Sequence, residues 1–450
     1  MYSKSFNLTV NHKIKPFNKS IKVDSDKSLS IRSFLLGSIA QNISEVKNVL
    51  ESEDVFSTIN CLKKLGVQIK SKSNGSYLIY GKGLGSHFAK KNLSLNFGNS
   101  GTLARLLIGI LSTTPGIEIT VKGDRSLNKR SMKKLINLMS EFGAQFLPKN
   151  KFNFPLKLIS TDMPIGISYK AGVSAQLKSA VILAGLNSFG ITNIVEEKKS
   201  RDHTENMLIK NTAAIKIKKK SEKKIIEIIG KKYLKSIKFD IPGDPSSAAF
   251  FTALTLLNNN SILRIKNVGL NPTRTGFYEL LKKHGANIKF LNKKKKNYEI
   301  IGDLIIKSGR LNKPISTSKK IYERTTDEFP MLFCIAALTP GISIFRGIED
   351  LANKESNRIK EMQKILKQIG IKTIASKNEM KIYGKNVINH KDKTIKVPGL
   401  GDHRICMSSM ILSLLTGVKT KINNFETVKT SSPNFLKIIK SLGAKFEINK

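Results

Sequence analysis

The chain has 450 residues, and its 78 Lys and Arg against 33 Asp and Glu give a formal net charge of +45. Hydrophobic residues at 40% and charged residues at 25% are ordinary globular values, which exclude a disordered or collagen-like chain. This length exceeds one typical hydrophobic core, so we expect two or three domains.

Three cysteines, too few and too scattered for a disulfide framework or a zinc site, lie in apolar helical patterns: Cys61, Cys334 and Cys406. The N-terminal residues lack the apolar core of a signal peptide, and the longest apolar stretches are too short to span a membrane. We therefore expect a cytoplasmic protein with no membrane anchor and no metal.

The densest basic runs are Lys218 to Lys220 and Lys293 to Lys296, and neither has the interleaved aromatic residues of a single-strand binder. We interpret both as solvated edges next to strands predicted at residues 224–230 and 297–302. A basic surface that binds nucleic acid is the alternative, and a small, multiply anionic substrate is another.

In chain order, the first recurring element is a helix that ends in glycine just before an apolar strand begins. These helix ends fall at Gly66, Gly143, Gly285, Gly370 and Gly443, with Thr212 in a degenerate third copy. Glycine suits a helix C-cap because the chain there adopts a positive φ before it enters the strand.

A second helix in each repeat begins at a capping residue and is apolar almost all round, which predicts a buried helix. The predicted starts are Asp26, Asn99, Ser174, Asp244, Asp327 and Asp402. Six βαβ-type repeats with buried helices predict an α/β protein with internal pseudo-symmetry. The helix starts would gather in one region and offer backbone N–H groups to anions.

Basic side chains lie at or near these starts: Lys27, Arg32, Arg105, Arg130, Lys354, Arg358 and Arg404. A buried cation without a partner costs several kcal/mol, so each needs a carboxylate or a bound anion. Because cations outnumber acids here, a ligand with phosphate and carboxylate groups would balance them. For Arg105, a structural ion pair and a ligand contact are both open.

Ten motifs in this frame resemble those of the EPSP synthase family, an enolpyruvyl transferase family, and the similarity runs essentially end to end. They are Asp26-Lys-Ser-Leu-Ser-Ile-Arg32, Gly98-Asn-Ser-Gly-Thr102, Gly123-Asp-Arg-Ser-Leu-Asn-Lys-Arg130, Ser174-Ala-Gln-Leu-Lys-Ser-Ala180, Ser200-Arg-Asp-His-Thr-Glu205, Gly243-Asp-Pro-Ser-Ser-Ala-Ala249, Asn271-Pro-Thr-Arg-Thr275, Asp327-Glu-Phe-Pro330, Lys354-Glu-Ser-Asn-Arg358 and Asp402-His-Arg404.

The resemblance implies a two-domain inside-out α/β barrel with three repeats in each domain and the active site in the cleft between them. From the repeat frame we expect an inserted domain at residues 24–243 and a discontinuous domain of residues 1–23 plus 244–450. Nothing in the sequence indicates an obligate partner, so we expect a monomer.

The implied activity is transfer of the enolpyruvyl group of phosphoenolpyruvate to the 5-hydroxyl of shikimate 3-phosphate, through a tetrahedral intermediate and without a cofactor or metal. The implied catalytic residues are Asp327 as general base, Glu355 as the residue that manages the methylene proton, and Lys27. The implied contacts to shikimate 3-phosphate are Lys27, Ser28, Arg32, Ser174, Ala175, Gln176, Ser200, Asp327 and Lys354. The implied contacts to phosphoenolpyruvate are Lys27, Gly101, Arg130, Gln176, Arg358 and Arg404.

The sequence departs from the family pattern at Ile31, Ser131 and Asn357, where His or Asn, Pro, and Asp are usual. Some members use a lysine near the C-terminus, but Lys429 is one residue out of register and is not assigned a role. Because Gly101 is retained, the resemblance also implies sensitivity to glyphosate, the family's inhibitor at the phosphoenolpyruvate site.

The nearest alternative is the sister enolpyruvyl transferase that acts on UDP-N-acetylglucosamine, which typically has a reactive cysteine in a mobile loop. The three cysteines here look buried, and the Ser200-Arg-Asp-His-Thr204 stretch fits the shikimate branch better. A basic nucleic-acid-binding protein is the alternative from another class.

Overall fold

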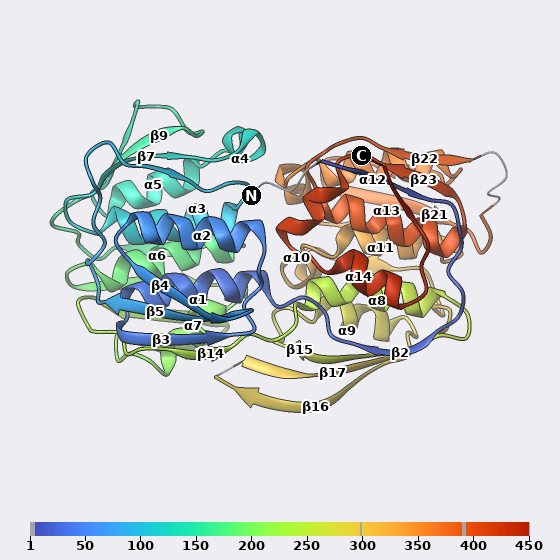
Figure 1. Cartoon of the computed structure of the whole chain (residues 1–450), viewed down its shortest axis with the longest axis horizontal. Helices are drawn as coiled ribbons and strands as arrows, with labels where there is room; N and C mark the ends of the chain where they lie inside the picture. The colour runs from blue at the N-terminus through green and yellow to red at the C-terminus, as the bar shows by residue number, and fades with distance from the viewer. Residues whose placement is uncertain (1–4, 298, 389–392, 450) are drawn as a thin grey trace. The chain divides into compact units, whose positions relative to one another are not determined.

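A computed structural model describes residues 5–297, 299–388 and 393–449, coloured along the chain in Figure 1. The described residues divide into two compact units. The inserted unit comprises Ser25–Ile241 with Asn297–Glu299, and the discontinuous unit comprises the described residues within Met1–Asp24, Pro242–Lys296 and Ile300–Lys450. Each unit contains three four-stranded sheets. Each sheet has one parallel strand pair at an edge, and antiparallel pairings extend it.

In the inserted unit the sheets have the strand orders β14-β3-β5-β4, β6-β7-β9-β8 and β10-β11-β13-β12. The strands are β3 (Gln41–Lys47), β4 (Gln68–Ser73), β5 (Ser76–Lys82), β6 (Ser94–Asn96), β7 (Glu118–Lys122), β8 (Gln145–Leu147), β9 (Leu156–Ile159), β10 (Ser168–Ala171), β11 (Ile191–Glu196), β12 (Ile215–Lys220), β13 (Lys223–Ile229) and β14 (Lys238–Asp240). The helices are α1 (Lys27–Ile39), α2 (Glu53–Lys64), α3 (Gly101–Ser112), α4 (Arg125–Lys129), α5 (Lys133–Glu141), α6 (Ala175–Leu186) and α7 (His203–Ile209).

In the discontinuous unit the orders are β16-β17-β15-β2, β18-β19-β21-β20 and β22-β23-β1-β24, so the first strands of the chain complete sheets made by much later ones. The strands are β1 (Asn7–Val10), β2 (Asn18–Ile21), β15 (Ile262–Gly269), β16 (Ile288–Lys296), β17 (Glu299–Lys307), β18 (Ser316–Thr317), β19 (Gly341–Arg346), β20 (Thr373–Ala375), β21 (Glu379–Gly384), β22 (Thr394–Val397), β23 (Lys419–Ile422) and β24 (Glu447–Asn449). The helices are α8 (Pro245–Leu257), α9 (Gly276–Lys283), α10 (Lys319–Thr325), α11 (Phe329–Ala337), α12 (Arg358–Gln368), α13 (His403–Thr416) and α14 (Phe435–Ser441), with 3-10 helices η1 (Glu349–Asn353) and η2 (Phe425–Thr430).

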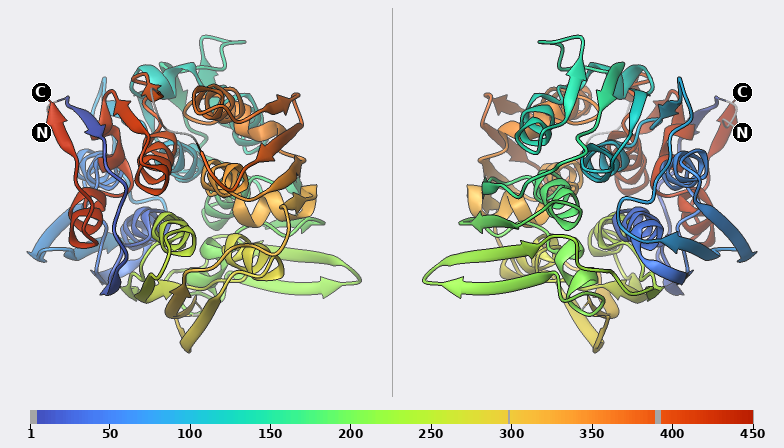
Figure 2. Two further views of the ribbon diagram at one scale, coloured as in Figure 1. Left: turned by 90° about the vertical axis from the view of Figure 1, so that its right-hand side faces the viewer. Right: turned by 90° about the vertical axis from the view of Figure 1, so that its left-hand side faces the viewer.

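The sheets of each unit lie on the outside and the helices lie in the middle (Figure 2). In the inserted unit α1 is buried from Leu29 to Ile39. The helices α3 and α6 approach so closely that a Cβ atom on Gly109 would lie 2.7 Å from the carbonyl oxygen of Ala180, so only glycine fits there. The prediction of an inside-out α/β fold with buried helices is confirmed.

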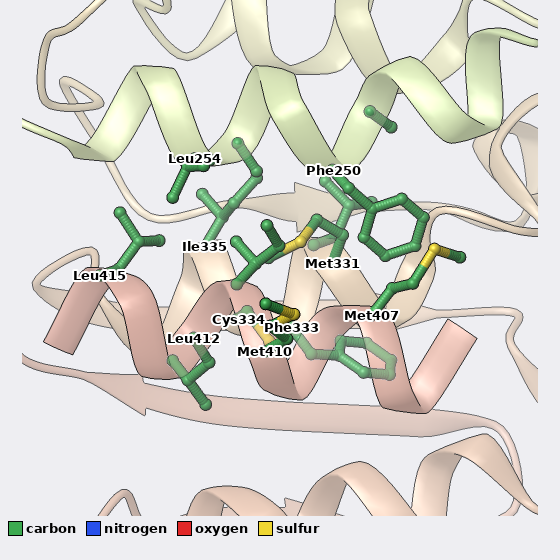
Figure 3. Close-up of a cluster of buried hydrophobic side chains, with 14 of the residues drawn as sticks. Phe250, Leu254, Met331, Phe333, Cys334, Ile335, Met407, Met410, Leu412 and Leu415 are labelled. Carbon is green, nitrogen blue, oxygen red and sulfur yellow. The ribbon is translucent and has the colours of Figure 1, made fainter. Parts of the chain in front are cut away.

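The core of the discontinuous unit is built in the same way from α8, α11 and α13. Figure 3 shows their side chains meeting, with Phe250 and Leu254 from α8, Ile335 from α11 and Met407 and Met410 from α13. All five residues are completely buried. Helices that are apolar on every side are stable only when they are surrounded by other parts of the protein. A helix packed on one side alone would leave its remaining apolar faces in water.

The glycine helix ends are confirmed: Gly66, Gly143, Gly285, Gly370 and Gly443 all have positive φ, between 79° and 104°. Two of the predicted helix starts are wrong. Helix α3 is capped by Ser100 and not by Asn99, and α11 begins after Glu328 without a side-chain capping bond, so Asp327 is not its cap. Both misplaced residues instead have their side chains directed to arginines, as described below.

The two lysine runs lie within strands, and not beside them as expected. Lys218 to Lys220 end β12, and Lys293 to Lys296 end β16. Each strand is the outermost of its sheet. Lysines on an edge strand discourage further strand pairing because the charges must stay solvated, which supports the interpretation of these runs as solvated surface.

Candidate active site

In the inserted unit, the predicted site residues gather at the starts of the three buried helices. Asp26, Ser100 and Ser174 cap α1, α3 and α6, each accepting a hydrogen bond from a backbone N–H of the first turn. The first residues of these helices are Lys27, Gly101 and Ala175, all predicted ligand contacts. Helix N-termini favour bound anions because unpaired N–H groups and the positive end of the helix dipole point outward.

Lys27 is held by a carboxylate that the sequence analysis did not identify. Its Nζ lies 2.9 Å from Oδ2 of Asp54, in the first turn of α2. The Asp54 side chain is 6% exposed, whereas that of Lys27 is 19% exposed. The ion pair therefore anchors the ammonium group while part of the lysine still faces solvent.

Arg32, on the next turn of α1, is buried and donates to hydroxyl groups. Its Nη1 donates to Oγ of Ser28 at 2.5 Å, and its Nε donates to Oγ1 of Thr204 at 2.9 Å. The predicted shikimate-phosphate contacts Ser28 and Arg32 are thus brought together by one helix turn. Ser200 lies elsewhere in this polar network, and its hydroxyl donates inward to Oε1 of Glu196 at 2.7 Å.

Arg105 has an amide partner in the third repeat. Its Nη1 donates to Oε1 of Gln176 at 2.7 Å, and Nε2 of Gln176 donates to Oγ1 of Thr102 at 2.8 Å. The amide of Gln176, a predicted contact to both substrates, is thereby fixed by two residues of α3. A Cβ atom on Gly101 would lie 2.8 Å from Nη1 of Arg105, so a side chain there would crowd this pair.

Arg130 follows α4 and lies close to the start of α3. Its Nη2 donates to Oδ1 of Asn99 at 2.5 Å, and a Cβ atom on Gly101 would lie 3.3 Å from its Nη1. Asn99 therefore positions an arginine and does not cap a helix. Ser131, the departure from the usual proline, accepts a hydrogen bond from the backbone N–H of Lys133 at 3.3 Å, at the start of α5.

In the discontinuous unit, a buried carboxylate organises the predicted arginines. Nε of Arg358 donates to Oδ2 of Asp402 at 3.0 Å, and Nη2 donates to Oε2 of Glu355 at 2.6 Å. Nη1 of Arg358 lies 3.9 Å from Oδ1 of Asp327. Both predicted proton-transfer residues, Asp327 and Glu355, thus lie beside one guanidinium. Burial acts to lower the pKa of Arg358, but Asp402 and Glu355 outweigh it, so the pKa is raised and the group stays charged.

Arg404, the second residue of α13, is 4% exposed. Its guanidinium carbon lies 5.7 Å from the centre of the Phe250 ring. Its Nε and Nη1 have no hydrogen-bond partner among the residues that the structure describes. A buried cation with unused donors is costly unless an anion binds it.

Three further residues discussed above lie in the discontinuous unit. Nζ of Lys354 lies 3.1 Å from Oδ2 of Asp350. Asn357 caps α12 by accepting from the N–H of Lys360 at 3.1 Å, so the usual aspartate is not needed for this cap. Lys429 lies in η2 with its Nζ 5.8 Å from the centre of the Phe6 ring.

The three cysteines are buried, as expected. Burial raises the pKa of Cys61 to about 12 and that of Cys334 and Cys406 further still, so none resembles a reactive thiol. In the described ranges, no cluster of His, Cys, Asp and Glu has the arrangement of a metal site. Within the same ranges, every helix is too short or too polar to cross a membrane.

The six-repeat fold, with cations and carboxylates at the buried helix starts, defines an enolpyruvyl-transferase-type α/β protein. A solved structure titled as the enolpyruvyl transferase NikO from Streptomyces tendae has this fold, with a TM-score of 0.73, 12% identity and 99% coverage of both chains. The sequence profile of EPSP synthase (3-phosphoshikimate 1-carboxyvinyltransferase) matches residues 11–439. The chain belongs to the EPSP synthase family.

Relatives of nearly the same length support this membership. A 3-phosphoshikimate 1-carboxyvinyltransferase from Zymomonas mobilis is 37% identical over 442 residues, which cover 98% of this chain and 97% of that protein. A structure of EPSP synthase from Acinetobacter baumannii has a TM-score of 0.85 at 34% identity and covers 99% of this chain and 100% of that one. The family predicted from the ten motifs is confirmed, and with it the prediction of an enzyme.

Proposed function

We propose that this protein transfers the enolpyruvyl group of phosphoenolpyruvate to the 5-hydroxyl of shikimate 3-phosphate and releases inorganic phosphate. The observation that carries the proposal is Arg404, whose buried guanidinium has hydrogen-bond donors that no described residue uses. An anionic substrate would supply the missing acceptors. Phosphoenolpyruvate, with a carboxylate and a phosphate, has the right chemistry.

The two substrates would be bound by different groups of residues. Ser28, Arg32 and Ser174 would hold shikimate 3-phosphate at the starts of α1 and α6, with Lys354 from the discontinuous unit. Phosphoenolpyruvate would be bound by Arg130, Arg358 and Arg404, and Lys27 and Gln176 would contact both substrates. Residues of both units would thus act on the same pair of substrates, and movement of the units would exclude water from them.

The reaction needs one base and one acid near the reacting carbons. Asp327 would accept the proton of the 5-hydroxyl as its oxygen attacks C2 of phosphoenolpyruvate, and Glu355 would protonate the methylene carbon. The Glu355 carboxylate would then take a proton from the resulting methyl group as phosphate leaves the tetrahedral adduct, which regenerates the double bond. The 3.9 Å approach of Arg358 to Asp327 and its bond to Glu355 keep both carboxylates next to a positive charge.

Ser200 is the least supported of the proposed contacts. Its only hydroxyl proton is directed to Glu196, so it would have to rotate before it could donate to a phosphate. The proposal also retains a monomer in the cytoplasm that binds neither nucleic acid nor a membrane.

The test is phosphate release by the purified protein with phosphoenolpyruvate and shikimate 3-phosphate, run beside the same assay with UDP-N-acetylglucosamine. We expect turnover only with shikimate 3-phosphate. Turnover with the nucleotide sugar would assign the sister activity instead. Absence of turnover together with tight, salt-sensitive binding in a gel shift would favour the nucleic-acid-binding alternative.

A further inference from the structure

Two hydroxyl groups from the third repeat hold Arg32 of the first repeat. Nε of Arg32 donates to Oγ1 of Thr204 at 2.9 Å, and Nη2 donates to Oγ of Ser179 at 3.2 Å. The two hydroxyl oxygens are themselves 2.8 Å apart. All three side chains are buried. Helices α1, α6 and α7 are therefore joined at one guanidinium, which lies beneath the helix starts that carry the proposed shikimate-phosphate contacts.

Hydroxyl acceptors can orient an arginine that must bind an anion. The hydroxyls of Thr204 and Ser179 accept from Nε and Nη2 and so orient the guanidinium, and neither hydroxyl carries a charge of its own. The hydrogen bonds already hold the guanidinium in one orientation. Binding an anion therefore costs little further side-chain entropy.

An ion pair one residue away from each hydroxyl fixes α6 relative to α7. Nζ of Lys178 lies 2.7 Å from Oε1 of Glu205 and 2.6 Å from Oε1 of Glu196, and the side chains of Lys178 and Glu205 are fully buried. Burial acts to lower the pKa of Lys178, and the two carboxylates reverse this and raise it. Such a buried ion pair adds little net stability, but it fixes the relative position of the two helices. Ser179 directly follows Lys178, and Thr204 directly precedes Glu205. The ion pair therefore also holds these two hydroxyl residues in place.

We propose that Thr204 and Ser179 are positioning residues that orient the Arg32 guanidinium for the phosphate of shikimate 3-phosphate. This inference rests on the function proposed above. It adds two residues that act through Arg32 and have no required contact with the substrate. Their loss should weaken binding of shikimate 3-phosphate and leave phosphoenolpyruvate binding nearly unchanged.

The test is the nearly isosteric variant Thr204→Val, which removes the hydroxyl and keeps the packing. A matched control is Thr192→Val, because Thr192 is also buried in the third repeat and its hydroxyl has no hydrogen-bond partner among the described residues. We measure KM for each substrate, kcat, and the Kd of shikimate 3-phosphate by calorimetry. Loss of one hydrogen bond to a charged group changes an equilibrium constant by roughly tenfold. We therefore expect KM and Kd for shikimate 3-phosphate to rise by about that factor.

In the supporting outcome, KM for phosphoenolpyruvate changes less than about twofold, Thr192→Val behaves as wild type, and Thr204→Ser restores the Kd because it restores the hydroxyl. Ser179→Ala provides a second variant if Thr204→Val does not fold. Equal effects on both substrates, or an unchanged Kd in a folded variant, would overturn the positioning role alone. A wild-type protein that neither binds nor turns over shikimate 3-phosphate would overturn the proposed function as well.

Discussion

Arg358 and Asp402 are both fully buried, and Nε of the arginine donates to Oδ2 of the carboxylate at 3.0 Å. The other carboxylate oxygen, Oδ1, accepts from the backbone N–H of Arg404 at 2.9 Å and so caps α13. One aspartate therefore orients the first proposed phosphoenolpyruvate arginine and begins the helix that carries the second. Nη1 of Arg358 and both Nε and Nη1 of Arg404 have no hydrogen-bond partner among the described residues, so each arginine keeps at least one donor for a ligand.

Replacing the proposed general base should stop the reaction without unfolding the protein. We expect Asp327→Asn to lower kcat by about 100-fold or more, because the amide cannot accept the hydroxyl proton. Its side chain is 27% exposed and caps no helix, so circular dichroism and the melting temperature should stay close to wild type. Asp162→Asn, at an exposed site of the inserted unit, is the control and should be fully active. Full activity of Asp327→Asn would contradict its role.

Lys27→Met should lose both activity and stability, because it leaves Asp54 in a mostly buried position without its cation. We expect a loss of about 1 to 3 kcal/mol in the free energy of unfolding, measured by urea denaturation. The double variant Lys27→Met with Asp54→Asn should regain stability but not turnover, since the carboxylate charge is gone while the ammonium is still missing. Regained turnover in the double variant would exclude Lys27 from catalysis. Lys64→Met, on the same unit, is the control.

Arg404→Met, unlike Lys27→Met, should lose activity without losing stability. Removing a buried cation that has unused donors should leave the melting temperature unchanged or raise it, while turnover falls by about 100-fold or more. Phosphoenolpyruvate should stabilise the wild-type protein against heat and give no shift in this variant. A strongly destabilised variant that still responds to phosphoenolpyruvate would show that Arg404 serves the fold and not the ligand.

Gly101→Ala should raise KM for phosphoenolpyruvate, because the new methyl group would lie 2.8 Å from Nη1 of Arg105 and 3.3 Å from Nη1 of Arg130. The wild-type protein should be inhibited by glyphosate in competition with phosphoenolpyruvate. The variant should be inhibited less, since both ligands would meet the same obstruction. Steady-state kinetics with varied inhibitor decide this, and Gly172→Ala, where nothing lies within 4 Å of the added Cβ, is the control. Undiminished wild-type activity at high glyphosate concentration would contradict the prediction.

His87 should make the inserted unit sensitive to acid. Its Nε2 lies 3.1 Å from Oγ of Ser38, and burial lowers the pKa of the imidazole to about 4. The unfolded chain takes up a proton below about pH 6.5 while the folded chain does not, so stability falls as the pH falls toward 4, by about 1.4 kcal/mol per pH unit. His87→Gln should flatten this slope in urea denaturation measured from pH 7 to pH 4.5. An equal slope in both proteins would show that other groups determine acid sensitivity.

The repeat architecture could be predicted from the sequence because its signals are local. A glycine at a helix end and an apolar helix after a polar start depend on a few neighbouring residues, and six copies reinforce one another. The side-chain partners could not be predicted in this way. Asp54 next to Lys27, and Thr204 next to Arg32, come from other elements, and neither pairing leaves a periodic trace in the sequence.

The same distinction explains the two wrong helix caps. Asn99 and Asp327 have the residue types of N-caps, and local preference alone cannot separate a cap from a ligand of a distant arginine. The sequence by itself determined the family, the six repeats, the buried helices and the set of cations. Only the tertiary structure decided which carboxylate, amide or hydroxyl each cation meets, because hydrogen bonds and ion pairs require atoms within a few ångströms, and folding alone brings distant segments that close.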